Sequence, residues 1–329
     1  MIQAAFFGPQ TQLERVYPPS RRAHLEKVAA FFPHRIDAGN FSTYAAELRE
    51  IEVVFSTWGM PSLSDSQIAQ MPKLRAVFYA AGTVQHFARP FLARGIEVFS
   101  AWSANGVPVA QWTLAQILLA NKGFFRNHRE FQSERMGQKS FSGRGNFGAT
   151  VSLLGAGQIG RRVIEYLRPF DLEICVFDPF LSEEAARELN VEKVELNAAF
   201  ERGDVVSNHL ANLPATVGML RGKHFAVMPP NATFINTGRG ATVRESELIE
   251  VLAARSDLNA LLDVTDPEPP LPDSPLWEMK NVVLTSHVAG SIGDEVVRMA
   301  DYMIEEFESW LDGKPTRFSV SEAMLETMA

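Results

Sequence analysis

Short runs of apolar, β-branched and aromatic residues alternate along the chain with segments whose apolar residues recur at helical spacing. In the first part of the chain the candidate strands are Ala4–Phe7, Val53–Ser56, Ala76–Tyr79 and Glu97–Ser100. Helical patterns between them include Arg22–Phe31 and Phe87–Arg94, and a longer helix is expected over Val107–Phe125. Strands that alternate with helices indicate parallel sheets of the α/β class.

A second series of the same kind begins at Val151. Its candidate strands are Val151–Leu154, Glu173–Phe177, Val205–Asn208, Thr233–Asn236, Ala260–Asp263 and Val282–Thr285. The last long helix is expected over Gly293–Trp310, because Gly313 and Pro315 stop it. We therefore predict two Rossmann-like or flavodoxin-like parallel-sheet domains with an active-site cleft between them. The first domain is expected to be discontinuous, over residues 1–102 and 296–329, and the second to cover residues 103–295.

The composition narrows the class of protein. The chain has 329 residues, 46% of them hydrophobic and 21% charged, which suits about two globular domains. Its formal net charge of −8 argues against nucleic acid as a main partner, because binding a phosphate backbone requires a basic surface. The single cysteine, Cys175, excludes an intrachain disulfide framework and a cysteine-rich metal site, and no metal is expected. No apolar run approaches the roughly 18 residues of a membrane span and no secretory signal is visible, so the expected location is the cytoplasm.

A G-x-G-x-x-G pattern stands between a candidate strand and the helix that follows it. In a dinucleotide-binding turn of this kind, Gly155 permits the tight turn, Gly157 the close approach of a pyrophosphate, and Gly160 the packing of helix on strand. The amides of Gln158 and Ile159, at the start of the helix, would face the phosphates. Glycines also mark ordinary turns, so the signal depends on this placement between strand and helix.

An acidic residue at the end of the next strand is the second part of the pattern. Asp178 directly follows the strand that ends in Phe177 and lies 18 residues after Gly160. A carboxylate at this place accepts hydrogen bonds from the ribose hydroxyls and repels a 2′-phosphate. The sequence therefore predicts NAD, rather than NADP, as the cofactor.

Charged residues follow three later strands. Arg239 stands in the segment Asn236–Gly240, Glu268 follows the strand that ends in Asp263, and His287 follows the next strand. The carboxyl ends of parallel strands meet at one edge of a sheet, where open α/β sheets bind ligands. The three side chains are therefore expected to lie close together.

At these residues the chain resembles the D-isomer-specific 2-hydroxyacid dehydrogenases. Their signature places an arginine in an Asn-x-x-Arg-Gly turn, a glutamate before a proline and a histidine ahead of a loop of small residues, which match Arg239, Glu268 and His287. The resemblance covers about residues 76–310. It implies an NAD-dependent oxidoreductase that interconverts a small D-2-hydroxy acid and its 2-oxo acid, and a homodimer joined through the long helix after Val107.

The three residue types suit the implied reaction. Arg239 can hold a carboxylate with two parallel hydrogen bonds and polarise the carbonyl. His287 can donate a proton to the developing alkoxide, while Glu268 on its other ring nitrogen would hold one tautomer and favour the protonated ring. The hydride comes from the nicotinamide.

The resemblance assigns further positions to the substrate and the cofactor. The substrate carboxylate is expected on the backbone amides of a turn formed by Ala81, Gly82 and Thr83, with Arg239 and His287 as the other substrate-binding residues. Besides the glycine-rich segment and Asp178, the residues implied for the cofactor are His209, Thr216, Thr237, Asp263 and Gly290. Asp263 would lie near the nicotinamide amide; the alternative is a simple cap of the strand end.

Three positions depart from the family pattern. Gln111 stands where glutamate is usual, Ser286 where proline usually precedes the histidine, and Ala211 where proline is usual after the cofactor-loop histidine. None removes a catalytic group, and the substrate stays open among glyoxylate, hydroxypyruvate and phosphoglycerate-type acids. Two alternatives also remain. One is a phosphite-type dehydrogenase on the same scaffold, and the other is an NAD-sensing, corepressor-like binding protein, which keeps the same three residues.

Overall fold

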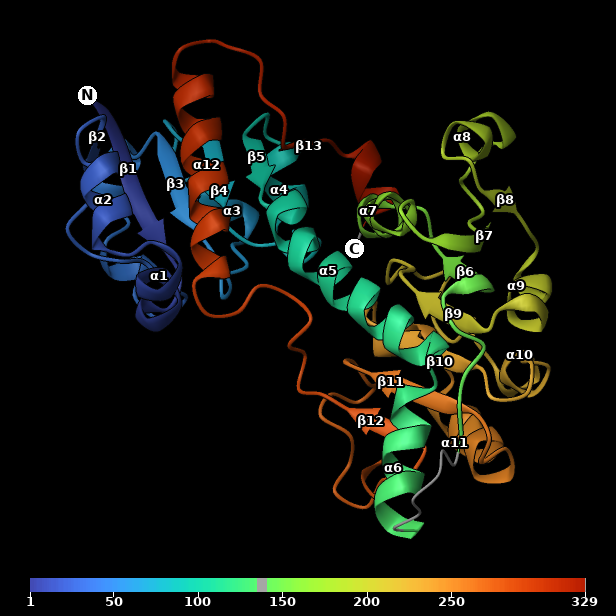
Figure 1. Ribbon diagram of the computed structural model, residues 1–329. Helices are drawn as coiled ribbons and strands as arrows, with labels where there is room; N and C mark the ends of the chain where they lie inside the picture. The colour runs from blue at the N-terminus through green and yellow to red at the C-terminus, as the bar shows by residue number, and fades with distance from the viewer. Residues whose placement is uncertain (135–140, 329) are drawn as a thin grey trace. The chain divides into compact units, whose positions relative to one another are not determined.

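The computed structural model describes residues 1–134 and 141–328 of the chain. The chain divides into two compact units, one formed by Met1–Gly106 with Ser291–Ala329 and the other by Val107–Gly290. The first boundary falls inside the longest helix, α5 (Trp102–Asn121). Each unit is built on one sheet whose neighbouring strands are parallel almost throughout, which confirms the predicted fold class (Figure 1).

The first unit contains a six-stranded sheet in the order β13-β5-β4-β3-β1-β2. Its strands are β1 (Ile2–Phe7), β2 (Ala29–Phe31), β3 (Val53–Ser56), β4 (Ala76–Tyr79), β5 (Glu97–Ser100) and β13 (Ser319–Val320). Only β13 runs antiparallel to its neighbour. Every residue of β3 and β4 is buried, as expected for central strands covered on both faces.

Helices cover this sheet, and the last long helix of the chain completes its core. The helices are α1 (Gln10–Val16), α2 (Pro19–Leu25), α3 (Asp65–Ile68), α4 (Ala88–Leu92) and α12 (Glu295–Leu311), with short 3₁₀ turns at Phe41–Thr43, Glu47–Glu50 and Ala323–Glu326. The rings of Phe55 and Phe78 stack with centroids 5.3 Å apart, and Phe307 of α12 meets them edge-on at 5.1 and 5.3 Å. This aromatic contact joins α12 to strands that lie more than 220 residues earlier in the chain, which makes the unit discontinuous.

The second unit contains a seven-stranded parallel sheet in the order β12-β11-β10-β9-β6-β7-β8. Its strands are β6 (Phe147–Leu154), β7 (Asp171–Phe177), β8 (Glu192–Lys193), β9 (Val205–Asn208), β10 (Thr233–Asn236), β11 (Asn259–Leu262) and β12 (Val282–Leu284). The order reverses between β6 and β9, and in such sheets the ligand crevice opens at the carboxyl ends of the strands that flank the reversal.

The helices of the second unit are α6 (Phe124–Glu134), α7 (Gln158–Leu167), α8 (Glu183–Glu188), α9 (Leu196–Arg202), α10 (Gly222–Ala226) and α11 (Glu245–Ala254), with 3₁₀ turns at Gly240–Thr242 and Pro275–Trp277. Phe200, Phe225 and Phe234 form an aromatic cluster under α9 and α10. Within the described part of the chain, no helix combines the length and apolar character needed to cross a membrane.

Every predicted strand is present, some with ends shifted by up to four residues, but two predicted helices are wrong in extent. The segment Arg22–Phe31 contains the end of α2 and then strand β2, which pairs in parallel with β1. The segment Val107–Phe125 spans two helices, and the chain breaks between them at Gly123, where φ is +71°. A Cβ at this glycine would lie 2.6 Å from the backbone nitrogen of Gly143 and from the Phe141 ring, so only glycine fits.

Replacing Phe307 tests the dependence of the first unit on α12. Phe307→Ala removes a fully buried ring and should lower the free energy of unfolding by about 3–5 kcal/mol. Leu311→Ala, in the same helix but with the leucine 43% exposed, should cost less than about 1 kcal/mol. Urea titration followed by circular dichroism measures both, and equal losses would contradict the role given to Phe307.

Candidate functional site

The three charged residues predicted for the site interact at the carboxyl edge of the second sheet. Nδ1 of His287 lies 2.7 Å from Oε1 of Glu268. Burial lowers the pKa of Arg239, and the negative charge of Glu268 opposes this shift, which places the carboxylate within electrostatic reach of the guanidinium. The edge thus combines a cation, a carboxylate and an imidazole that can donate and accept protons.

A buried carboxylate holds the loop that carries His287. Asp263 follows β11 and is 4% exposed. Its Oδ1 accepts hydrogen bonds from Oγ1 of Thr285 (2.6 Å) and the amide of Val288 (2.8 Å), and its Oδ2 accepts one from the amide of Ala289 (3.0 Å). The carbonyl of Asp263 accepts a fourth hydrogen bond from the amide of His287, a residue with φ of +57°. Asp263 therefore holds the shape of this loop, and its place near the nicotinamide amide stays a prediction.

Asn208 and Thr242, which no sequence motif indicated, hold the turn around Arg239 together with Asn236. Oδ1 of Asn236 accepts hydrogen bonds from the amide of Gly238 (3.1 Å) and from Nδ2 of Asn208 (3.0 Å). Oγ1 of Thr242 donates to the carbonyl of Arg239 at 2.8 Å, and Nδ2 of Asn208 donates to the same Thr242 hydroxyl. The one signal for this network in the sequence is that two neighbouring buried strands, β9 and β10, each end in an asparagine.

Glycine brings the arginine turn against the segment that leads to Glu268. A Cβ at Gly240 would lie 2.0 Å from the carbonyl of Thr265. The side-chain hydroxyl of Thr265 donates to the carbonyl of Pro267 at 2.8 Å and shapes the approach to Glu268. This backbone contact explains how residues of two separate strand ends come within reach of each other.

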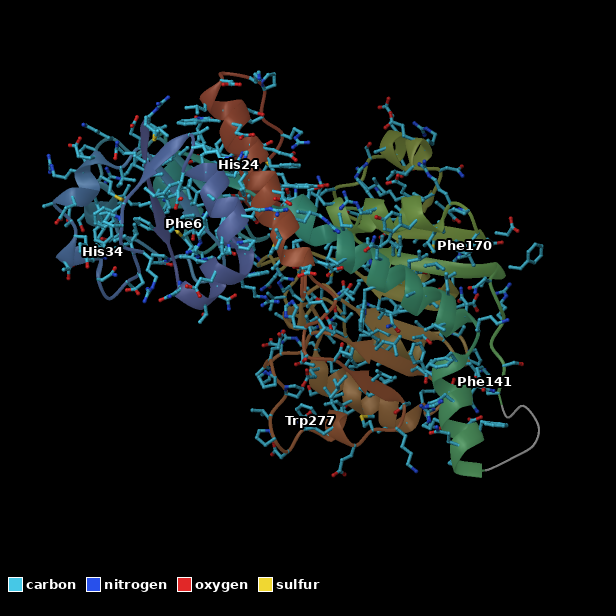
Figure 2. The ribbon with its side chains drawn as sticks, turned by 60° about the vertical axis from the view of Figure 1, so that its left-hand side comes forward. Phe6, His24, His34, Phe141, Phe170 and Trp277 are labelled. Carbon is cyan, nitrogen blue, oxygen red and sulfur yellow. The ribbon has the colours of Figure 1, made fainter. Side chains whose placement is uncertain are left out.

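A histidine–carboxylate pair is not by itself a site. His24 of α2 lies 2.7 Å from Glu308 of α12, the same separation as in the pair at His287, and both partners are partly exposed (Figure 2). The pair formed by His287 and Glu268 differs by its place at the carboxyl ends of parallel strands and by the half-buried Arg239 beside it.

The three glycines of the glycine-rich turn, at the carboxyl end of β6, have different surroundings. Gly155 has φ of +100°, and a Cβ there would lie 2.9 Å from the carbonyl of His209. A Cβ at Gly160 would lie 2.0 Å from the carbonyl of Gly155, so the helix packs directly on the turn. At Gly157, no described atom lies within 4 Å of such a Cβ, and the backbone is open to a ligand. The amides of Gln158 and Ile159 open α7 and are oriented as in an anion-binding helix start.

Asp178 lies beside this turn. Its Oδ2 accepts a hydrogen bond from the amide of Ala156 (2.6 Å) and its Oδ1 one from the amide of Phe180 (2.7 Å). Each carboxylate oxygen has a second lone pair, so Asp178 can brace the glycine-rich turn and still accept from a ribose hydroxyl.

His209 and Thr237 form one polar chain next to the turn. Nε2 of His209 lies 3.0 Å from Oγ of Ser207, and Nδ1 lies 3.5 Å from Oγ1 of Thr237. Burial lowers the pKa of His209 to about 4, so its ring is neutral near pH 7. A neutral ring suits a wall of the cofactor site better than a proton donor.

Thr216 and Gly290, the remaining residues predicted for the cofactor, have different surroundings. The hydroxyl of Thr216 contacts the carbonyls of Ala211 (2.5 Å) and Leu213 (3.0 Å) and is 2.9 Å from the amide of Leu213, so it shapes its own loop. Gly290 is the last residue of the second unit and directly follows the loop that Asp263 holds.

The turn predicted for the substrate carboxylate belongs to the first unit. Oγ of Ser100 lies 2.9 Å from the carbonyl of Ala81 and 2.5 Å from that of Gly82, which fixes the carbonyl side of the turn. The amide of Ala81 donates to the carbonyl of Tyr79 and is therefore occupied. Within the described residues, the amides of Gly82 and Thr83 donate to no protein acceptor, so these two, rather than all three, are free for an anion.

Comparison with known proteins places this site in a family. Residues 114–289, more than half of the chain, match the model of the D-isomer specific 2-hydroxyacid dehydrogenase, NAD binding domain, and the match includes the glycine-rich turn and all three charged residues. The D-3-phosphoglycerate dehydrogenase of Archaeoglobus fulgidus is 29% identical over 233 residues, which are 71% of this chain and 44% of that protein. The chain thus spans about half the length of the curated relatives it matches.

Solved structures show the same fold at low identity. A phosphoglycerate oxidoreductase from Rhizobium etli superposes with a TM-score of 0.83 at 22% identity, covering 99% of this chain and all of the other. An acyclic imino acid reductase in complex with NADPH and D-Arg superposes with a TM-score of 0.74 at 19% identity, covering 97% of this chain and 100% of the other. Identities this low establish the fold alone. The family match goes further: the chain belongs to the D-isomer specific 2-hydroxyacid dehydrogenase family, and residues 114–289 form its NAD binding domain.

Proposed function

We propose that the protein is an NAD(H)-dependent oxidoreductase that interconverts a small D-2-hydroxy acid and its 2-oxo acid. The observation that carries this proposal is the pair formed by His287 and Glu268, with Arg239 beside it, at the ligand-binding edge of an NAD binding domain. Each residue corresponds to one need of the reaction: charge stabilisation, proton transfer and control of the proton donor.

The geometry distributes the roles. Nδ1 of His287 faces Glu268, so Nε2 is the nitrogen left to donate a proton to the carbonyl oxygen of a 2-oxo acid during reduction. Oε1 of Glu268, 2.7 Å from Nδ1, holds the imidazole ring in one orientation and one tautomer. Arg239 binds the substrate carboxylate and polarises the carbonyl, which the planar guanidinium can do with two hydrogen bonds.

The second unit supplies the residues that would hold the cofactor. The open backbone at Gly157 and the amides of Gln158 and Ile159 suit the pyrophosphate, and Asp178 suits the adenosine ribose. When bound, NADH supplies the hydride.

The first unit is proposed as the substrate domain. The free amides of Gly82 and Thr83 support this role, because two adjacent N–H groups without protein acceptors are suited to a carboxylate. The carbonyls of Ala81 and Gly82 accept hydrogen bonds from the hydroxyl of Ser100, so their oxygens do not face the anion.

Turnover of 2-oxo acids tests the reaction. The wild type should oxidise NADH with at least one small 2-oxo acid, such as glyoxylate or hydroxypyruvate. Glu268→Gln keeps the size of the side chain but removes its charge, so the reductive kcat/KM should fall about 10- to 100-fold. Glu308→Gln makes the same change in the surface pair with His24 and should leave kcat/KM unaltered. If the protein binds NADH but turns over no acid of the panel, it is a binding protein and the proposal is wrong.

Cofactor preference depends on Asp178. A carboxylate that faces a 2′-phosphate places like charges together, so kcat/KM for NADH should exceed that for NADPH by about 100-fold. Asp178→Asn keeps one oxygen for the amide of Ala156, gives up the acceptor for the amide of Phe180 and removes the charge. The ratio should narrow to about tenfold or less. Asp171→Asn, an exposed residue at the start of β7, is the control. A wild-type enzyme with the higher kcat/KM for NADPH would contradict the assignment.

We further propose a homodimer that buries apolar surface on and around α5 and α6. Leu119 of α5, Phe124 and Phe131 of α6 and Phe147 of β6 are 38%, 45%, 47% and 79% exposed, and exposed large apolar side chains on these elements support an interaction surface. In sedimentation experiments the protein should have about twice the mass of the 36.5 kDa chain. Phe131→Glu should give monomers, whereas Trp277→Glu, at an exposed residue of a 3₁₀ turn in the same unit, should not (Figure 2). A wild type that sediments as a monomer at micromolar concentration would rule the dimer out.

A further inference from the structure

The C-terminal strap, residues 321–328, returns to the turn that carries the free amides. The side-chain amide of Gln85 donates one hydrogen bond to the carbonyl of Leu325 and one to that of Met328, both at 2.7 Å. A glutamine Nε2 carries two protons, so each carbonyl receives its own donor. The backbone amide of Gln85 lies 3.4 Å from the hydroxyl of Thr83, which links the strap to the turn.

The strap is itself anchored to the first unit. Leu325 is 1% exposed and belongs to one of the two hydrophobic cores of this unit. Arg89 of α4 lies 3.3 Å from Glu326. Just before the strap, β13 pairs with β5, and the carbonyl of Phe318 accepts from the amide of Ser100. The strap thus offers Gln85 two carbonyl groups that are fixed by packing.

The turn needs such an anchor because one of its sides is unsatisfied. Ser100 holds its carbonyls, but the amides of Gly82 and Thr83 have no acceptor within the described residues. Because no hydrogen bond orients the two amides of this half-buried turn, their direction depends on how the residues on either side of them are held.

We propose that Gln85 is a positioning residue for the substrate: by binding the C-terminal strap, it holds the amides of Gly82 and Thr83 in the orientation that receives the substrate carboxylate. This inference rests on the proposed function, which places the carboxylate on this turn. The inference adds Gln85 and the C-terminal strap, both in the first unit, to the residues proposed for substrate binding.

A purely structural role for the strap predicts a different outcome. If the strap only covers the core, its contribution comes from Leu325, and the hydrogen bonds of Gln85 matter little for substrate binding. Changing Gln85 while keeping Leu325 separates the two roles, because the apolar contact is preserved.

The decisive variant is Gln85→Glu, which keeps the shape of the side chain but replaces both donated protons with a negative oxygen that faces two carbonyls. The KM for the 2-oxo acid should rise about tenfold. The kcat and the KM for NADH should change less than about twofold, because the cofactor residues lie in the other unit. Hydrogen–deuterium exchange should become faster in the strap, at the hydrogen-bonded amides of Leu325 and Met328, and just after the turn, at the amides of Phe87 and Ala88, which donate to the carbonyl of Val84. Gln70→Glu, an exposed glutamine of the same unit, makes the same change of charge and should have none of these effects.

The outcomes distinguish this inference from the proposed function. If exchange becomes faster in the strap while the KM for the 2-oxo acid is unchanged, the strap is only a cover and the inference is wrong, although the dehydrogenase activity stands. If the wild type turns over no 2-oxo acid, the proposed function is wrong and the inference falls with it. Should Gln85→Glu fail to fold, Gln85→Ala removes the same two donors without adding charge and must raise the same KM.

Discussion

One buried carboxylate organises the edge of the sheet on which the charged site is built. Asp263 accepts hydrogen bonds from a threonine hydroxyl and two backbone amides, and its carbonyl accepts a fourth from His287. His287 has a left-handed backbone conformation, which is unfavourable for a residue with a side chain by about 1 kcal/mol or more. Hydrogen bonds to a buried charge are worth more than that, about 1.5–3 kcal/mol each, so Asp263 determines where the imidazole stands.

Close contacts between backbones assemble the rest of the site. Gly160 brings α7 onto the glycine-rich turn, and Gly240 brings the arginine turn onto the segment that leads to Glu268. At both places a Cβ would lie 2.0 Å from a carbonyl oxygen, so any other residue would push apart two segments that carry functional groups. These backbone contacts position the segments that carry the charged side chains, so few further side-chain contacts are needed to bring those side chains together.

The type of a residue does not decide its role; its surroundings do. The pairs formed by His24 and His287 have the same length, yet one joins α2 to α12 and the other stands at the carboxyl edge of the second sheet. His209 also follows a strand of the second sheet, but burial lowers its pKa to about 4 and makes it unsuitable as a proton donor near pH 7. The fold does not decide the reaction either, since solved structures with this architecture include an imino acid reductase bound to NADPH.

The sequence by itself determined the fold class, every predicted strand, the glycine-rich turn and the three charged residues, because alternating strands and helices and short motifs are local patterns. It could not determine that Arg22–Phe31 ends in an edge strand, since pairing with β1 overrides the helical spacing. It also could not show that Asp263 holds the histidine loop, or that Asn208 and Thr242 support Arg239, because those hydrogen bonds join different strand ends. Gln85 and Leu325 lie 240 residues apart, and only the tertiary structure brings the strap to the turn. Contacts of this kind depend on packing in three dimensions, which no periodicity along the chain records.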